Sequence, residues 1–358
     1  MDINRRNMAF TVALFLGGAM LLTSYVTDIT SWEAWVPALL AFFLSFAVVS
    51  IYLKLTKKYP EKHLPEIFVC VFGKCAGYAV SWAYVFFFLV IACFNTYSVS
   101  SFFVGYVMPE TPDIVFTVIF VFICSRAVRL GIENITKISI FIFFLISLFI
   151  ILNFILLLSQ MKISNFLPLF DHSFYEYLQA AHTELMNPFG ETVVFLMFAD
   201  KIKNNDFRSA LIWGIIIGGV MLMLVVIRSV AVLGVTISIS AVPSYEVLRL
   251  INIKNMITRI ETLYSFLLLI LGFFKVSIIY CAISRLTAYL TGLKTEKSII
   301  NSVGAFLACM TAVSFTSGFD SVNWGTKYAA FFATPFVFII PCFLLLVITV
   351  KRKGEKAK

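Results

Sequence analysis

Charged side chains are scarce in this chain of 358 residues: Asp, Glu, Lys and Arg together make up 13% of it, whereas 61% is hydrophobic and 39 residues are phenylalanine. The mean hydropathy is +0.96. A water-soluble domain could not keep so much apolar surface from solvent, which excludes a soluble fold. We therefore expect an all-α integral membrane protein, a single domain over residues 1–358.

Patterns typical of enzymes and metal sites are missing as well. The sequence contains no nucleophile–base constellation, no phosphate-binding loop and no metal-ligand cluster, so we expect no enzymatic activity, no cofactor and no bound metal. Three histidines, His63, His172 and His182, fall in segments that we interpret as polar connections. The cysteines lie mostly inside apolar runs without metal-ligand spacing, and we interpret them as small core residues: Cys70, Cys75, Cys93, Cys124, Cys281, Cys309 and Cys342.

The net charge of +9 does not indicate a nucleic-acid partner, because most basic residues fall in short loops on one side of the expected membrane. That bias predicts that both termini are cytoplasmic. The few basic residues expected on the outer side are Lys162, Arg249, Lys254, Arg259 and Lys327. The inner set comprises Lys54, Lys57, Lys58, Lys62, Arg126, Arg129, Lys137, Lys201, Lys203, Arg208, Arg285, Lys294 and Lys297, with a tail of Lys351, Arg352, Lys353, Lys356 and Lys358.

Ten apolar segments approach the roughly 20 residues that a spanning helix needs. The fourth, sixth and ninth are short or interrupted, and the third and eighth are unusually long, which predicts tilt or extension beyond the bilayer. The segments are Asn7–Tyr25, Trp35–Leu53, Gly77–Val107, Asp113–Ser125, Ile138–Leu158, Leu185–Ala199, Ser209–Leu233, Ile260–Leu290, Ile299–Phe315 and Tyr328–Val350.

The sixth segment contains an acid where a membrane helix tolerates it badly. Pro188, Phe189, Gly190 and Glu191 interrupt its apolar run. Proline removes a helix hydrogen-bond donor and glycine permits unusual backbone angles, so we expect the helix to break here. A broken helix and a carboxylate at membrane depth need protein or a cavity around them. We predict a binding site at this break, although Glu191 could instead be a structural acid that fixes the break in place.

A pair of glycines, Gly17 and Gly18, lies near the centre of the first segment. The first and sixth segments are five apart, and an odd number of helices in each half makes the halves inverted. We therefore expect two inverted five-helix repeats, roughly residues 7–158 and 178–350, with a site where the two breaks meet. The alternative is that the glycines only allow close helix packing.

Two basic residues lie within apolar segments. Lys275 is midway along the eighth segment, and Glu191 is the partner we expect for it, although the lysine could snorkel through a tilted helix. Arg228 is nearer the end of the seventh segment, so we expect it to snorkel or to meet a loop acid. On the third segment, Asn95 and Tyr97 belong to a polar run that either faces the site or bonds neighbouring helices.

The order and spacing of several motifs resemble the endospore germination permease family, the B subunits of germinant receptors, within the amino acid–polyamine–organocation superfamily. No single motif is decisive, and the first helix matches least. The motifs are Pro109–Pro112, Arg126–Glu133, Phe166–Pro168, Pro188–Glu191, Val247–Ile251, Arg259–Glu261 and Phe274–Ser277. The resemblance implies a leucine-transporter-like fold, A and C partner subunits, the inner membrane of the spore and a small nutrient ligand, commonly an amino acid.

Two functions stay open at this point. A sensor would bind a germinant and pass a conformational signal to its partner subunits. A proton-coupled amino acid or amine transporter would use Glu191 and Lys275 as a proton-linked switch. The motif context favours the sensor, whereas the residues themselves fit both. The candidate ligand-binding residues are Gly17, Gly18, Asn95, Tyr97, Pro188, Phe189, Gly190, Glu191 and Lys275.

Overall fold

The computed structural model describes residues 3–19, 24–250 and 260–356, and every regular element in these ranges is helical. Lys254, Arg259 and Lys358, which carry part of the expected charge bias, lie outside them. The first half contains α1 (Arg5–Gly17), α2 (Ser24–Thr30), η2 (Ser31–Glu33), α3 (Trp35–Lys58), α4 (Leu64–Phe72), α5 (Lys74–Tyr106), α6 (Asp113–Leu130) and α7 (Ile132–Leu157). The second half contains η3 (Ile163–Phe166), α8 (Phe174–Glu184), η4 (Leu185–Phe189), η5 (Gly190–Lys201), α9 (Asn204–Leu233), η6 (Gly234–Ile239), α10 (Pro243–Arg249), α11 (Ile260–Thr291), η7 (Glu296–Ser298), α12 (Ile300–Ser314), α13 (Gly318–Lys327), α14 (Ala329–Thr334), η8 (Pro335–Ile339) and α15 (Ile340–Lys356).

Within the described ranges, six helical stretches are long and apolar enough to cross a membrane, which confirms a multi-pass membrane protein. They are Trp35–Lys58, Lys74–Tyr106, Ile132–Leu157, Asn204–Ile239, Thr262–Thr291 and Ala329–Lys351. A seventh span is possible if α12 and α13, which are bent by 97° relative to each other, are taken together. The predicted sixth segment, Leu185–Ala199, is interrupted as expected: it is divided between η4 and η5, and the backbone angles of Asn187 are not helical.

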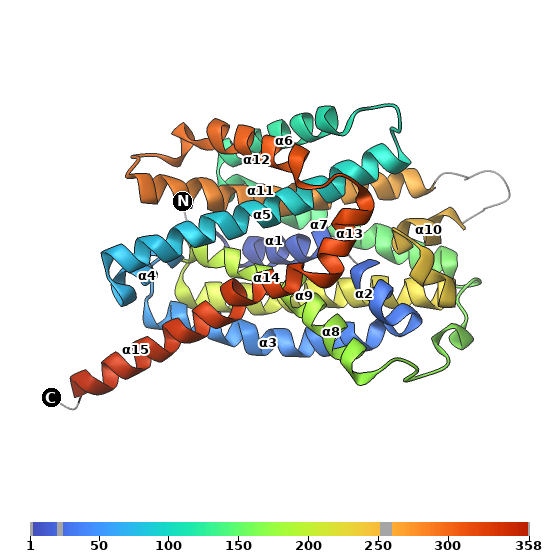
Figure 1. The fold of residues 1–358 in the computed structure, drawn as a ribbon, viewed down its shortest axis with the longest axis horizontal. Coiled ribbons are helices and arrows are strands. Elements are labelled where there is room, and N and C mark those ends of the chain that lie inside the picture. The colour runs from blue at the N-terminus through green and yellow to red at the C-terminus, as the bar shows by residue number, and fades with distance from the viewer. Residues whose placement is uncertain (1–2, 20–23, 251–259, 357–358) are drawn as a thin grey trace.

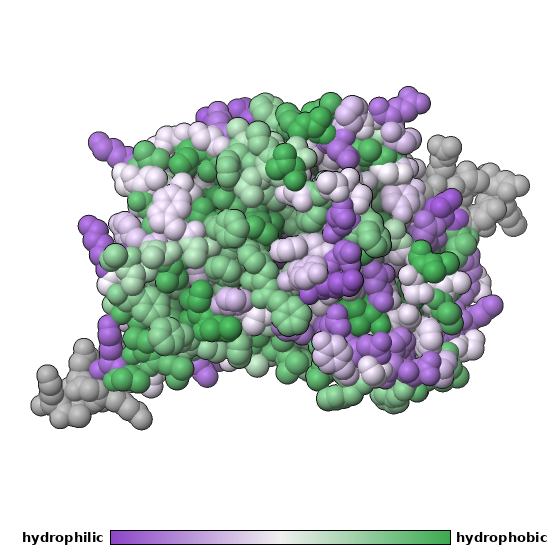
Figure 2. Space-filling view, viewed as in Figure 1, coloured by the Kyte–Doolittle hydropathy of each residue, from purple (hydrophilic) through white to green (hydrophobic). Residues whose placement is uncertain are grey.

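The long helices α3, α5, α9 and α11 run along the long axis of the molecule, and both ends of the chain lie toward the left in Figure 1. Hydrophobic residues cover the middle of the face shown in Figure 2, and hydrophilic residues gather toward its left and right ends. This is the distribution that a protein needs when lipid surrounds its middle and water its two ends.

Helix α1 lies inside this bundle, and glycines of α9 make room for it. Val12 and Leu16 of α1 are fully buried. A Cβ atom on Gly214 would come within 2.4 Å of Val12 Cβ, and one on Gly218 within 2.8 Å of Leu16 Cδ1. Small residues allow membrane helices to approach closely where lipid gives little hydrophobic drive for association. The contact places the end of α1 next to the middle of α11.

Salt bridges and polar contacts gather at the end of the bundle where the chain ends. Lys201 Nζ lies 2.5 Å from Glu133, and Arg285 Nη2 lies 2.5 Å from Asp200. Lys58 donates a hydrogen bond to Thr349 at 2.9 Å. These three basic residues belong to the set that the charge bias places on the inner side of the membrane.

At the opposite end of the bundle, the buried acid Glu33 holds two segments together. Glu33 has a side chain with no exposed surface, and it accepts hydrogen bonds from the backbone N–H groups of Phe170, Asp171 and His172. The ring Nδ1 of His172 and the hydroxyl of Tyr177 lie 2.6 Å from the same carboxylate. Burial alone would raise the pKa of Glu33, but these hydrogen bonds together lower it below the usual 4.5. The carboxylate fastens the loop before α8 to the start of α3.

We predict that Glu33→Gln lowers stability by about 1.5–3 kcal/mol, because the surrounding donors lose a charged acceptor and one of its two oxygens is replaced by an NH2 donor. A carboxyl group whose pKa is lowered in the folded state stabilises the fold above the unfolded pKa, and that contribution is lost as pH falls through the folded value. Thermal unfolding of the parent should therefore show a loss of stability below about pH 4.5 that the variant lacks. Glu110→Gln, on an exposed acid, is the control. Equal pH profiles for the parent and Glu33→Gln would contradict this role.

Candidate functional site

The backbone breaks where the sequence predicts it. Asn187, with φ −140° and ψ 98°, leaves the helical region between α8 and η5. Tyr52 of α3 connects the break to η8. Its hydroxyl donates to Val337 O at 2.8 Å and also lies 3.2 Å from Gly190 O, so the hydrogen bond is shared between the two carbonyls. A Cβ atom on Gly190 would lie 2.4 Å from Val337 Cγ1. Gly190 is therefore required for the close contact between the break and η8.

Lys275 and Glu191 form an ion pair in the core. Their charged atoms lie 2.7 Å apart, and the side chains are 0% and 4% exposed. The lysine ammonium also lies 5.4 Å from the centroid of the Phe15 ring, which supplies a cation–π contact from α1. The structure thus shows the pairing that the sequence indicated, and the pair joins α11 to η5 beside α1.

Gly18 lets the lysine reach this position. A Cβ atom there would lie 2.8 Å from Lys275 Cβ and 3.1 Å from the backbone oxygen of Leu271. Gly18 has ordinary helical angles, so the requirement comes from the close approach of α11 and not from unusual backbone geometry. Gly17, the last residue of α1, is buried beside it.

A second buried acid, Glu184, lies within electrostatic range of Lys275. It is the last residue of α8, immediately before the break. Glu184 is not among the site residues predicted from the sequence. Its position one residue before the apolar run that contains Glu191 is the signal that could have identified it. Two buried acids, Glu184 and Glu191, therefore flank the break along the chain.

The space next to Glu191 is small. This inner cavity has a volume of about 20 Å³ and is lined by Val90, Ile91, Phe94, Asn187, Glu191, Trp324, Ala329, Phe332 and Ala333. A cavity of that size admits about one water molecule. The break is therefore closed around the ion pair in this structure, with no room for a nutrient beside the carboxylate.

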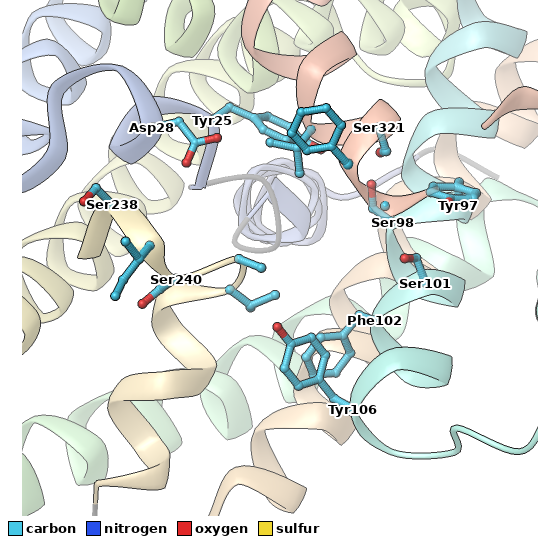
Figure 3. Close-up of a pocket in the computed structure, with 16 residues that line it drawn as sticks. Tyr25, Asp28, Tyr97, Ser98, Ser101, Phe102, Tyr106, Ser238, Ser240 and Ser321 are labelled. Atoms are coloured by element: carbon cyan, nitrogen blue, oxygen red, sulfur yellow. The ribbon is translucent and has the colours of Figure 1, made fainter. Parts of the chain in front are cut away.

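A larger outer cavity of about 480 Å³ lies between α2, α5, the end of η6 with the segment that follows it, and α13. Figure 3 shows Asp28, Ser238 and Ser240 on one side of it and Tyr97, Ser98 and Ser101 on the other. Of the described residues that line it, Asp28 alone carries a formal charge at neutral pH. Its lining consists of Tyr25, Asp28, Tyr97, Ser98, Ser101, Phe102, Tyr106, Ser238, Ile239, Ser240, Ala241, Val242, Gly318, Phe319, Ser321 and Val322.

An aromatic pair separates the two cavities. Tyr25 lines the outer cavity, Phe94 lines the inner one, and their rings stack with centroids 5.7 Å apart. Tyr25 also fits closely against α13, since a Cβ atom on Gly325 would lie 2.6 Å from its ring. A ligand in the outer cavity would need Tyr25 to move before it could reach Glu191.

The comparisons with known proteins agree with this architecture. The model of the spore germination protein family matches residues 2–319. The chain belongs to this family. Spore germination protein KB of Bacillus subtilis (strain 168) is 24% identical over 369 residues, covering 99% of this chain and 98% of that protein. Spore germination protein YndE of the same strain is 23% identical over 265 residues, covering 72% of this chain and 71% of that protein.

Two solved structures show the type of fold. The chain superposes on a Na⁺-coupled sialic acid symporter in a substrate-bound outward-open state with a TM-score of 0.64 at 14% identity, covering 93% of this chain and 79% of that one. Against Mhp1, a nucleobase-cation-symport-1 family transporter in a closed conformation with bromovinylhydantoin bound, the TM-score is 0.68 at 10% identity, with 94% and 79% covered. Both have leucine-transporter-like folds, so this germination protein has a transporter-like fold. The ten-helix count and the inverted repeats stay predictions.

The structure divides the predicted site residues of this germination protein into two groups. Lys275 contacts both Gly18 and Glu191 at the centre, and Gly17, Pro188 and Gly190 are buried next to these residues along the chain. Tyr97 lines the outer cavity instead. The remaining two residues, Asn95 and Phe189, line neither cavity. The Asn95 amide donates to Ile91 O within its own helix. The ring of Phe189 packs near the ring of Phe42 in α3, with the two centroids 6.2 Å apart.

Two sequence expectations are corrected by the structure. Arg228 does not snorkel or meet a loop acid: its side chain is 1% exposed, and it makes no ion pair with any described residue. The position of a residue along a helix does not reveal which side faces other helices, and α9 turns Arg228 inward. His182 lies inside α8, not in a connection, with its Nε2 2.8 Å from the Thr334 hydroxyl.

We predict that Gly18→Ala destabilises the protein by about 1–3 kcal/mol, because overpacking must move α1 away from α11 or displace Lys275. Gly105→Ala is the matched control, since a Cβ atom there would meet no atom within 4 Å. When thermal unfolding is measured in detergent, the midpoint should be lower for Gly18→Ala than for the parent. For Gly105→Ala it should be unchanged or higher, because alanine favours the helix more than glycine does. Equal midpoints would show that the close approach of α11 to Gly18 is unimportant.

Proposed function

We propose that this chain is the membrane subunit of a germinant receptor, which binds a small nutrient and signals through A and C partner subunits in the inner membrane of the spore. The observation that carries the proposal is the combination of an open outer cavity with a closed centre. Membership of the spore germination protein family supports the biological role. The fold supports ligand binding between helices that change their arrangement.

The outer cavity suits an amino acid or another amine. Its volume falls within the range of roughly 300–1,000 Å³ usual for small-molecule sites. Asp28 can receive an ammonium group, and the hydroxyls of Ser101 and Ser321 can donate to a carboxylate. The hydroxyls of Ser98, Ser238 and Ser240 donate to backbone carbonyl groups in this structure, so they would have to rotate to do the same. Aromatic rings at Tyr97 and Phe102 offer apolar contact to a side chain. A basic residue is absent from the described lining, which favours ligands with a positive group.

Binding there could produce a signal because the cavity joins elements that can move separately. Asp28 and Tyr25 belong to α2, Tyr97 to α5 and Ser321 to α13. A ligand that contacts all three favours whichever arrangement brings them together. The difference in affinity between two arrangements is the free energy available for the signal. The Glu191–Lys275 pair holds the centre closed in the arrangement described here.

The proposed topology places both termini in the cytoplasm. The salt-bridged end with Lys58, Lys201 and Arg285 is then the inner end, in agreement with the charge bias. We count the predicted segments Asn7–Tyr25 and Leu185–Ala199 as the first members of two inverted five-helix repeats. The repeats run over roughly residues 7–158 and 178–350.

The alternative function is a proton-coupled amino acid or amine transporter. The folds of the two symporters named above favour it, since each of those proteins moves a substrate together with a cation. In that case Glu191 and Lys275 would exchange a proton during each transport cycle. The sensor and the transporter differ in whether the ligand is released on the far side.

We predict that spores carrying Glu191→Gln fail to germinate with the nutrient that the parent subunit senses, whereas Asp28→Asn raises the nutrient concentration needed. The first change frees Lys275 from its partner, and the second removes the group that receives the ligand cation. Glu110→Gln, an exposed outer acid, should respond like the parent. Germination is followed by the fall in optical density, with membrane abundance measured for each variant.

A normal response from Glu191→Gln at parental abundance would overturn the assignment of the central pair. The transporter alternative is tested with the purified subunit in liposomes. The sensor should bind the nutrient without accumulating it, whereas accumulation driven by a proton gradient in the absence of partner subunits would favour the transporter.

A further inference from the structure

A buried guanidinium without a counter-charge lies away from the central ion pair. Arg228 is 1% exposed on α9, and its Nε and Nη2 atoms make no hydrogen bond with any described residue. None of the ion pairs among residues 3–19, 24–250 and 260–356 includes it. A buried charge without a partner is costly, so a group that balances Arg228 is expected.

Other polar groups around Arg228 are also without partners. Asn153 of α7 is buried, and neither its amide nitrogen nor its amide oxygen forms a hydrogen bond in the described part of the chain. Tyr264 of α11 has a buried hydroxyl within electrostatic range of Arg228. Several unsatisfied groups in one place are unusual for a native protein and indicate a missing water or ion.

Arg228, Asn153 and Tyr264 line one cavity between α7, α9 and α11, with apolar side chains completing the wall. Its volume is about 10 Å³, enough for a single particle of about the size of a water molecule. Arg228, the Asn153 amide and the Tyr264 hydroxyl can all donate hydrogen bonds toward the cavity. No carboxyl group is among its described lining residues.

Two acids with described side chains on the surrounding elements are paired with other basic residues. Glu246 of α10, which packs against α9 and α11, pairs with Arg249 at 3.1 Å. Glu133 lies at the opposite end of α7 from Asn153 and pairs with Lys201. The charge on Arg228 is therefore balanced by neither of them.

We propose that the cavity between Asn153, Arg228 and Tyr264 binds a small monovalent anion of the size of chloride. A lone water molecule fills the space but leaves the positive charge uncompensated. A nutrient carboxylate, which carries at least three heavy atoms, is too large for a cavity of this volume. A monatomic anion compensates the charge and is the anion closest in size to the space. Because chloride is slightly larger than a water molecule, the lining side chains must move apart slightly to admit it, and it accepts hydrogen bonds from three different helices.

The anion cavity is connected to the central site through a residue of α11. Leu271 lines the anion cavity, and its backbone oxygen is one of the atoms that a Cβ on Gly18 would meet, at 3.1 Å. A bound anion would thus act on the same part of α11 that α1 contacts. Its binding should stabilise the arrangement of α7, α9 and α11 whether or not the protein senses a nutrient.

The test compares the purified full-length protein in sodium chloride and in sodium gluconate of equal ionic strength. The midpoint of thermal unfolding should rise with chloride concentration for the parent, and this rise should be lost in Arg228→Met. In gluconate, Arg228→Met should be at least as stable as the parent, because it removes an uncompensated buried charge. Arg126→Met, on an exposed arginine, is the matched control and should keep the chloride response.

Bromide provides a second measurement that does not depend on the folding of any variant. Crystals of the parent protein grown with bromide should show an anomalous peak within hydrogen-bond distance of Arg228 and Asn153. Equal parental stability in chloride and gluconate would overturn the proposal, as would bromide crystals without that peak; either result would assign the cavity to water alone.

Discussion

Neither Glu191 nor Lys275 could keep its charge in the apolar centre of this bundle without the other. The cost of taking two ions out of water is several kcal/mol for each, and only close contact with good geometry repays it. That constraint explains the surrounding structure. Gly18 is small because Lys275 passes beside it, and Phe15 presents its ring to the ammonium group. The break before Gly190 brings the carboxylate to the same point from another helix.

The ion pair also connects the elements on which a transporter-like protein depends. It ties the interrupted sixth segment to α11, and α11 packs against α1 and α5. Tyr25 and Phe94 close the route from the outer cavity above it. A ligand bound near Asp28 would act on α2, α5 and α13 first, and on the pair only through these aromatic side chains. The described arrangement is thus open toward the outer cavity and closed at the centre.

The sequence predicts the pairing of Glu191 with Lys275 because charged residues are rare in long apolar segments. Few residues of opposite charge are therefore available inside the membrane to either of them. It also predicts the break at Pro188, where the residues themselves disfavour a helix. It does not predict the burial of Arg228, since facing directions depend on how α7, α9 and α11 pack. Asp28 and Glu33 were missed because acids near the end of an apolar segment look like ordinary loop residues. Asn95 was selected for its polarity, but its amide is satisfied within its own helix.

The most direct test of the central ion pair is a double-mutant cycle on Glu191→Gln and Lys275→Met, measured by thermal unfolding of the purified protein. Each single change leaves one buried charge without a partner and should cost on the order of 3–5 kcal/mol. The double variant should be more stable than either single variant, because no uncompensated charge remains. Single variants as stable as the parent, or a double variant whose loss equals the sum of the two, would show that the pair does not hold the centre of the protein together.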